Sequence, residues 1–102
     1  MSCPNQKIIA TIYNKKGHII SVGKNSYIKT HPMQAKLAEE AGFPECKYLH
    51  AEIDALIRCR GTPYKIKVER RGKNGKLCLA KPCPICELAI KNAKIKFVEY
   101  SV

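Results

Sequence analysis

Short β-rich runs alternate along the chain with segments of helical spacing. Apolar residues dominate positions 7–13 (KIIATIY) and 18–23 (HIISVG), and the polar turn NKKG joins the two runs, so we expect a β-hairpin. Positions 64–71 (YKIKVERR) alternate apolar and charged side chains, as a strand with one buried face does. Positions 77–80 (LCLA) form a short extended run, and positions 94–101 (KIKFVEYS) form a closing strand.

Three segments are predicted to be helices. The first begins at Pro32 and ends at Gly42, the second runs from the HAE segment at positions 50–52 to Gly61, and the third runs from PCPIC at positions 82–86 to about position 93. The predicted buried residues are Met33, Leu37, Ala38 and Ala41 in the first helix and Ile53, Leu56 and Ile57 in the second. The order β-β-α-α-β-α-β predicts an α/β fold, a three-layer α/β/α sandwich with a mixed sheet.

Length and composition narrow the class of protein. A chain of 102 residues with 45% hydrophobic residues suits one domain, residues 1–102, around one core. Nineteen Lys and Arg against eight Asp and Glu give a net charge of +11, which favours phosphate-bearing partners. The sequence has no apolar signal-peptide core and no run long enough to span a membrane. We therefore expect a cytoplasmic protein without a membrane partner.

The cysteines provide the first candidate chemistry. Without an export signal, the six cysteines are expected to be thiols or metal ligands and not disulfides. Cys83 and Cys86 lie three positions apart beside Pro84, a residue suited to the first turn of a helix. Both sulfurs then project from one face of a helix start, where the helix dipole favours thiolates.

His50 occupies the corresponding place at the start of the second helix. If the two helix N-termini face each other, His50, Cys83 and Cys86 provide three ligands, the number that leaves zinc a fourth position for water. Glu52 lies in the same first turn as His50 and can reach that water without binding the metal. The pattern therefore predicts a catalytic Zn²⁺ site.

The two motifs together form the H-x-E…P-C-x-x-C signature of zinc nucleobase deaminases. On these motifs the chain resembles the cytidine and deoxycytidylate deaminase superfamily. The resemblance implies a cytidine deaminase-like fold, shortened at the C-terminus, with zinc held by His50, Cys83 and Cys86. It also implies that Glu52 transfers protons while hydroxide attacks C4 of a cytosine, releasing ammonia.

The resemblance implies two substrate contacts as well. Ala51, small and near a helix start, is placed to offer its backbone N–H to the base, and Asn25 resembles the asparagine that family members use on the sugar. His50 stands where the tetrameric cytidine deaminases place Cys, and Lys81 departs from the residues typical of the transfer-RNA and polynucleotide enzymes. These departures do not by themselves choose among the enzymes; we expect a deoxycytidylate-like enzyme acting on a cytosine nucleotide. With the domain shortened, either a second subunit completes the site or the pocket is open, and we expect a homo-oligomer.

Two alternatives stay open. The substrate can instead be cytosine or adenine in single-stranded DNA or RNA, with the basic surface following the backbone. A non-enzymatic alternative uses Cys46, four positions before His50, as a fourth ligand. That arrangement would be a closed structural zinc site in a basic nucleic-acid-binding module.

Overall fold

The computed structural model of the protein describes residues 7–26, 28–45, 48–71, 77–78 and 83–101. Its elements follow the predicted order, with residues 79–80 of the LCLA run and the first residue of PCPIC outside the described residues. The strands and helices are β1 Lys7–Tyr13, β2 Ile19–Lys24, α1 Pro32–Glu40, α2 Ala51–Arg58, β3 Lys65–Arg71, β4 Leu77–Cys78, α3 Pro84–Asn92 and β5 Phe97–Tyr100.

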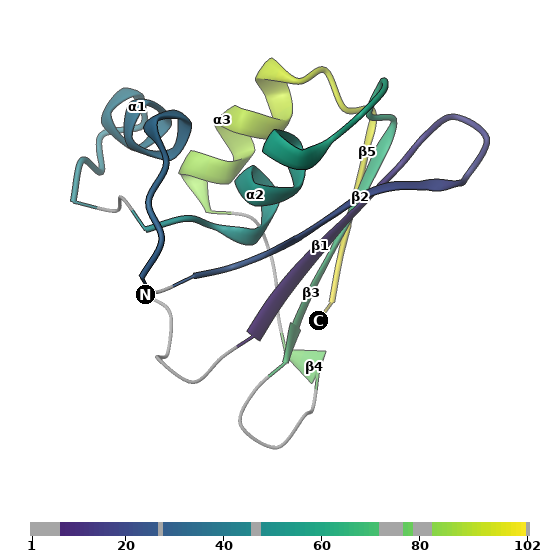
Figure 1. The fold of residues 1–102 in the computed structure, drawn as a ribbon, viewed down its shortest axis with the longest axis horizontal. Helices are drawn as coiled ribbons and strands as arrows, with labels where there is room; N and C mark the ends of the chain where they lie inside the picture. Colours follow the sequence, from purple (N-terminus) through teal and green to yellow (C-terminus); the bar gives the residue numbers. More distant parts are fainter. Residues whose placement is uncertain (1–6, 27, 46–47, 72–76, 79–82, 102) are drawn as a thin grey trace.

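The five strands form one mixed sheet (Figure 1). Its order is β2-β1-β3-β4, and these neighbouring strands are antiparallel. Strand β5 pairs in parallel with residues 65–68 of β3, while β4 pairs with residues 70–71 on the same strand. The predicted hairpin and the predicted mixed sheet are both confirmed.

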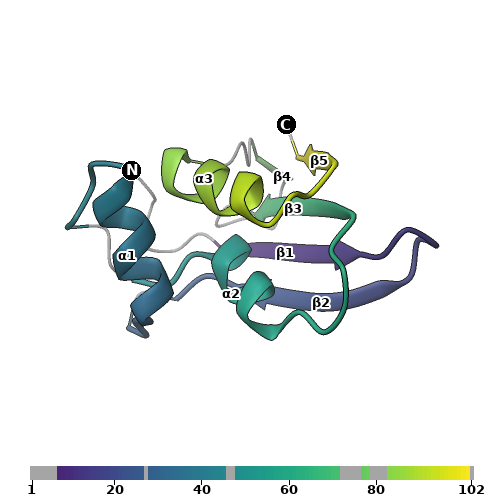
Figure 2. The same ribbon diagram turned by 90° about the horizontal axis from the view of Figure 1, so that it is seen from above.

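The described helices all lie on one side of the sheet (Figures 1 and 2). Helix α2 packs over β1 and β2, α3 contributes Ile90 to the core above the sheet, and α1 lies beyond the end of the strands. The α/β fold is confirmed, and the described residues supply two of the three expected layers. On β3 the alternation is as predicted, since Ile66 and Val68 are buried beneath the helices and Lys67 is exposed on the other face.

Helix α2 is buried on two sides because it belongs to two apolar clusters. The first lies between sheet and helices and consists of Ala10, Ile12, Ala51, Ala55, Ile66, Val68 and Ile90. The second lies among the three helices and consists of Leu37, Ala38, Leu49, Ile53, Ile85, Cys86 and Ala89. The prediction that Ile57 is buried is wrong, as it is 36% exposed. The helix turns Ala51 and Ala55 toward the sheet, with Leu56 packed partly buried against the same cluster.

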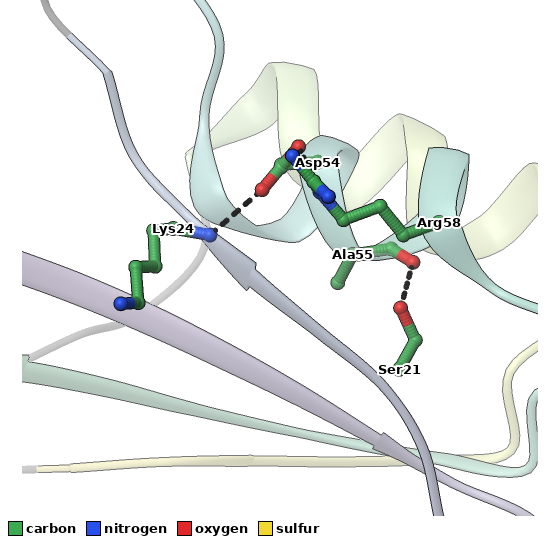
Figure 3. Close-up of polar contacts among 5 residues, drawn as sticks. All are labelled: Ser21, Lys24, Asp54, Ala55 and Arg58. Carbon is green, nitrogen blue, oxygen red and sulfur yellow. Dashed lines mark hydrogen bonds and ion pairs between the residues drawn. The ribbon is translucent and has the colours of Figure 1, made fainter.

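Gly23 explains that preference for small residues. A Cβ added to Gly23 would overlap the backbone of Ala51 and Ala55, so the helix lies directly against strand β2. Two hydrogen bonds hold the pair together (Figure 3): Ser21 Oγ donates to the Ala55 carbonyl oxygen at 2.6 Å, and Lys24 N donates to Asp54 Oδ2 at 2.9 Å. The edge strand and α2 therefore form a closely joined unit.

The structure also bears on the membrane expectation. Its helices are eight or nine residues long, and none in the described part of the chain is long and apolar enough to cross a membrane.

We expect Gly23→Ala to lower the free energy of unfolding by about 1–3 kcal/mol or more, because the new methyl group meets backbone atoms that cannot rotate away. Urea denaturation measures the change. The matched control is Lys24→Ala, which removes an exposed side chain from the next position and should cost no more than about 0.5 kcal/mol. Equal stability of the two variants would contradict the close packing of α2 on β2.

Candidate active site

His50 lies at the junction between a loop and helix α2. It is the N-cap residue, with an extended backbone (φ −84°, ψ 153°), and its side chain makes no capping hydrogen bond. Its backbone N–H donates to Gln34 Oε1 at 3.1 Å. Because the imidazole is not used for capping, the ring is available to face α3.

Cys83 and Cys86 lie at the start of α3. Cys83 is the N-cap residue and Pro84 begins the helix, so the proline supplies no N–H where none is needed. Cys86 follows in the first turn and is fully buried, whereas Cys83 is half-buried. Three-residue spacing on a helix places both sulfurs on the side that faces His50.

The three side chains converge as the sequence predicted. His50 Nδ1 lies 3.4 Å from Cys83 Sγ and 3.3 Å from Cys86 Sγ, and one ligand atom from each residue lies within 4.8 Å of the other two. In a tetrahedral zinc site the distance between a nitrogen and a sulfur ligand is about 3.6 Å, from Zn–N and Zn–S bonds of about 2.0–2.1 and 2.3 Å. The geometry and the donor atoms therefore fit Zn²⁺, with Nδ1 as the imidazole donor.

Glu52 occupies the second position of α2 and is only 5% exposed. Burial raises the pKa of its carboxyl above the ordinary value, and the negative charge of Cys83 adds to the increase. A hydrogen bond from its own backbone N–H, the charge of His50 and a hydrogen bond with Cys86 act in the opposite direction. A carboxyl group whose pKa is moved toward neutrality suits both accepting and donating a proton.

The two thiols differ strongly in acidity when no metal is bound. The hydrogen bond with Cys86 is the largest effect that lowers the pKa of Cys83 to about 4, with His50 contributing further. The same bond raises the pKa of Cys86 well above its ordinary value, and its burial adds to the increase. The hydrogen bond with Cys83 raises the pKa of His50. The site thus already stabilises one thiolate, and a bound cation favours the second.

Asn25 lies where β2 leaves the sheet, and its side chain has a structural role. Its side-chain Oδ1 accepts the backbone N–H of Ile8 at 2.9 Å, and the backbone N–H of Asn25 donates to the Ile8 carbonyl oxygen at 3.2 Å. Ala51 is likewise a packing residue, fully buried in the cluster above the sheet. Its backbone N–H is at the first helical position, where the helix itself offers no acceptor.

A pocket of about 440 Å³ lies beside Asn25, between the edge of β2 and α2. Its lining has three basic residues and one acid, and the acid, Asp54, is paired with Arg58 Nε at 3.0 Å. The side chain of Lys24 points away from Asp54 (Figure 3). The lining residues are Val22, Lys24, Asn25, Ser26, Lys29, Leu49, Asp54 and Arg58.

Gln34 is the site residue that sequence reasoning missed. It is fully buried, on the same face of α1 as Leu37 and Ala38, and its side-chain oxygen accepts the His50 N–H. The available signal was a polar residue three positions before Leu37, in line with the apolar face. Cys46 and Lys81, which entered the predictions of a closed zinc site and of substrate class, lie outside the described residues.

Comparison with known protein families agrees with this geometry. The model of the family described as "Cytidine and deoxycytidylate deaminase zinc-binding region" matches residues 1–102. A search of curated proteins found no match. The resemblance seen in the two motifs is confirmed by the family match, and the zinc cofactor is confirmed by the match together with the His50, Cys83 and Cys86 cluster.

In the metal-free protein we expect Cys83 to be a thiolate at every pH well above about 4 and to take up a proton only below it. Ultraviolet thiolate absorbance, followed during an acid titration of reduced and chelator-treated protein, measures this. Cys83→Ser should abolish the step near pH 4. A wild-type protein whose thiolates appear only near the ordinary cysteine pKa of about 8.5 would contradict the expected charge arrangement.

Proposed function

The chain belongs to the cytidine and deoxycytidylate deaminase zinc-binding family, and we propose that it hydrolyses the amino group of a cytosine nucleotide, producing a uracil nucleotide and ammonia. The observation that supports catalysis best is the position of Glu52. This carboxyl is buried in the first turn of α2, two residues after His50, and its pKa responds to Cys83, Cys86 and His50. An acid in that place serves proton transfer better than it serves packing.

We propose that His50 Nδ1, Cys83 Sγ and Cys86 Sγ hold Zn²⁺ and leave one position open. Zinc, when bound, supplies a Lewis acid that lowers the pKa of water toward neutrality. Glu52 takes a proton from the attacking water and delivers it to the pyrimidine ring nitrogen. It then takes the proton of the new hydroxyl group on C4 and transfers it to the amino group as the C4–N bond breaks, so that one water is consumed and one ammonia is released.

We expect Glu52→Ala to retain zinc and fold while deamination falls by at least about 10²- to 10⁴-fold, the usual contribution of a general acid and base. Ammonia release measures the activity, and elemental analysis measures zinc per chain. Cys86→Ser is the matched comparison, since it should lose both zinc and activity. Near-normal turnover in Glu52→Ala would remove this residue from the mechanism.

The pocket beside Asn25 supports a nucleotide as the substrate. Its basic residues Lys29 and Arg58 suit a phosphate, and Asn25 at its border suits the sugar. In this arrangement the Ala51 backbone N–H contacts the base. The net charge of +11 exceeds what one monophosphate needs, which favours single-stranded nucleic acid as the second candidate substrate. A homo-oligomer and a cytoplasmic location stay predictions.

We expect Asn25→Asp to raise the KM for the preferred cytosine nucleotide by roughly 10-fold or more, because a lost substrate hydrogen bond costs about 1–3 kcal/mol. The aspartate keeps an acceptor for the Ile8 N–H, so thermal stability should change less than in Asn25→Ala. KM is measured from steady-state ammonia release, with cytidine nucleosides, their monophosphates, adenine compounds and oligonucleotides as substrates.

Lys16→Ala, which removes one charge at the far end of the hairpin, should leave KM unchanged. Activity on oligonucleotides alone, with binding that weakens steeply as salt rises, would overturn the nucleotide assignment and leave the roles of zinc and Glu52 in place. Zinc-loaded protein that deaminates no compound would favour the structural module.

A further inference from the structure

We propose that Gln34 is a positioning residue of the metal centre, whose buried carboxamide fixes the backbone of His50 and thereby the direction of the imidazole. The inference rests on the proposed role of His50 as a zinc ligand. Gln34 Oε1 accepts the His50 N–H at 3.1 Å, which joins α1 to the N-cap residue of α2.

The burial of Gln34 argues that its polarity has a purpose. Gln34 is 0% exposed and lies on the face of α1 that packs into the cluster among the helices. Burying an amide without hydrogen bonds costs about 1–3 kcal/mol in proteins, and a Met or Leu would fill a similar volume without that cost. The hydrogen bond to the His50 N–H gives this buried carboxamide a partner at a core position.

The position of Gln34 along α1 is itself well determined. His31 caps the helix, with its Nδ1 accepting the Met33 N–H at 3.0 Å, and Pro32 begins it. Gln34 is therefore in the first turn of a helix whose start is fixed. One turn later, Leu37 and Ala38 anchor the same face among α2 and α3. A fully buried side chain on so constrained a backbone can define where its partner N–H lies.

The segment before α2 is otherwise held from the opposite side. Leu49 N donates to the Lys29 carbonyl oxygen at 2.9 Å, and Ser26 N donates to the Leu49 carbonyl oxygen at 2.9 Å. These bonds secure Leu49 to the loop after β2, and the His50 carbonyl oxygen accepts the Asp54 N–H at 2.9 Å, but neither set of bonds engages the His50 N–H. The ring Nδ1 contacts Cys83 Sγ and Cys86 Sγ at 3.4 and 3.3 Å, so a shift of the His50 backbone would move Nδ1 relative to both sulfurs. Gln34 supplies the bond that the loop does not.

The alternative is that Gln34 serves only the packing of α1. The two roles separate in three variants. Gln34→Met keeps a similar volume and loses the acceptor, whereas Gln34→Glu keeps an acceptor oxygen at the same reach. Leu37→Ala makes a packing defect on the same helix face without touching the His50 N–H. A packing role predicts that metal binding follows stability, and a positioning role predicts that it does not.

The experiment measures zinc affinity by chelator competition, the visible spectrum of the Co²⁺-substituted protein and the thermal midpoint. We expect Gln34→Met to bind zinc about 10- to 100-fold more weakly, the usual cost of losing a partner behind a metal ligand, and to show an altered Co²⁺ spectrum. Gln34→Glu should have an affinity closer to wild type. Leu37→Ala should lose more thermal stability and retain the wild-type spectrum.

Native zinc affinity in Gln34→Met, or an equal loss in Leu37→Ala, would overturn the positioning role. A wild-type protein that binds no zinc would overturn it together with the assignment of His50 as a ligand. Because the readouts need no turnover, wild-type protein that binds zinc tightly but deaminates nothing would overturn the proposed function alone, and a selective loss in Gln34→Met would still support the positioning role.

Discussion

The contact between Gly23 and helix α2 is the constraint on which the rest of the structure depends. With no side chain at Gly23, the backbone of Ala51 and Ala55 comes against the edge strand, and Ser21 and Lys24 hold it there by hydrogen bonds. The hydrogen bonds fix the orientation of α2 on strand β2, and the close contact at Gly23 fixes the distance between helix and strand. The N-terminus of α2 consequently has a defined place over the sheet, and its opposite side is available for packing against α1 and α3.

From that placement follows the convergence of two helix starts. His50 caps α2 and Cys83 caps α3, and both helices share the apolar cluster that includes Ile53 and Ile85. Each N-terminus carries a partial positive charge, which favours thiolates and a carboxylate in the same region. The burial of Glu52 and Cys86 acts against this partial charge, because burial raises their pKa values and so favours their protonated forms. A bound divalent cation stabilises both thiolates, because its charge replaces the solvation that the two sulfurs lose on burial.

Helix α1 contributes to the site without supplying a ligand. Among the described residues it packs chiefly on α3, yet Gln34 reaches the backbone of His50. The loop after β2 reaches the neighbouring Leu49 through backbone hydrogen bonds. The start of α2 is thus held at His50 by α1 and at Leu49 by the loop after β2. Such support from outside the motif is what keeps a metal site in one geometry.

Local patterns in the sequence determined the elements, the α/β class and the three candidate ligands, because strand alternation, helix starts and ligand spacing depend on neighbouring residues. The NKKG turn of the hairpin and the helix that begins at Pro84 are local signals of the same kind. Only the tertiary structure decided which face of α2 meets the sheet, leaving Ile57 exposed where periodicity predicted burial. It also assigned Asn25 a hydrogen bond to Ile8 and brought Gln34 to His50. These contacts join residues sixteen or more positions apart, and their partners are set by how closely helices approach the sheet, which no local spacing encodes.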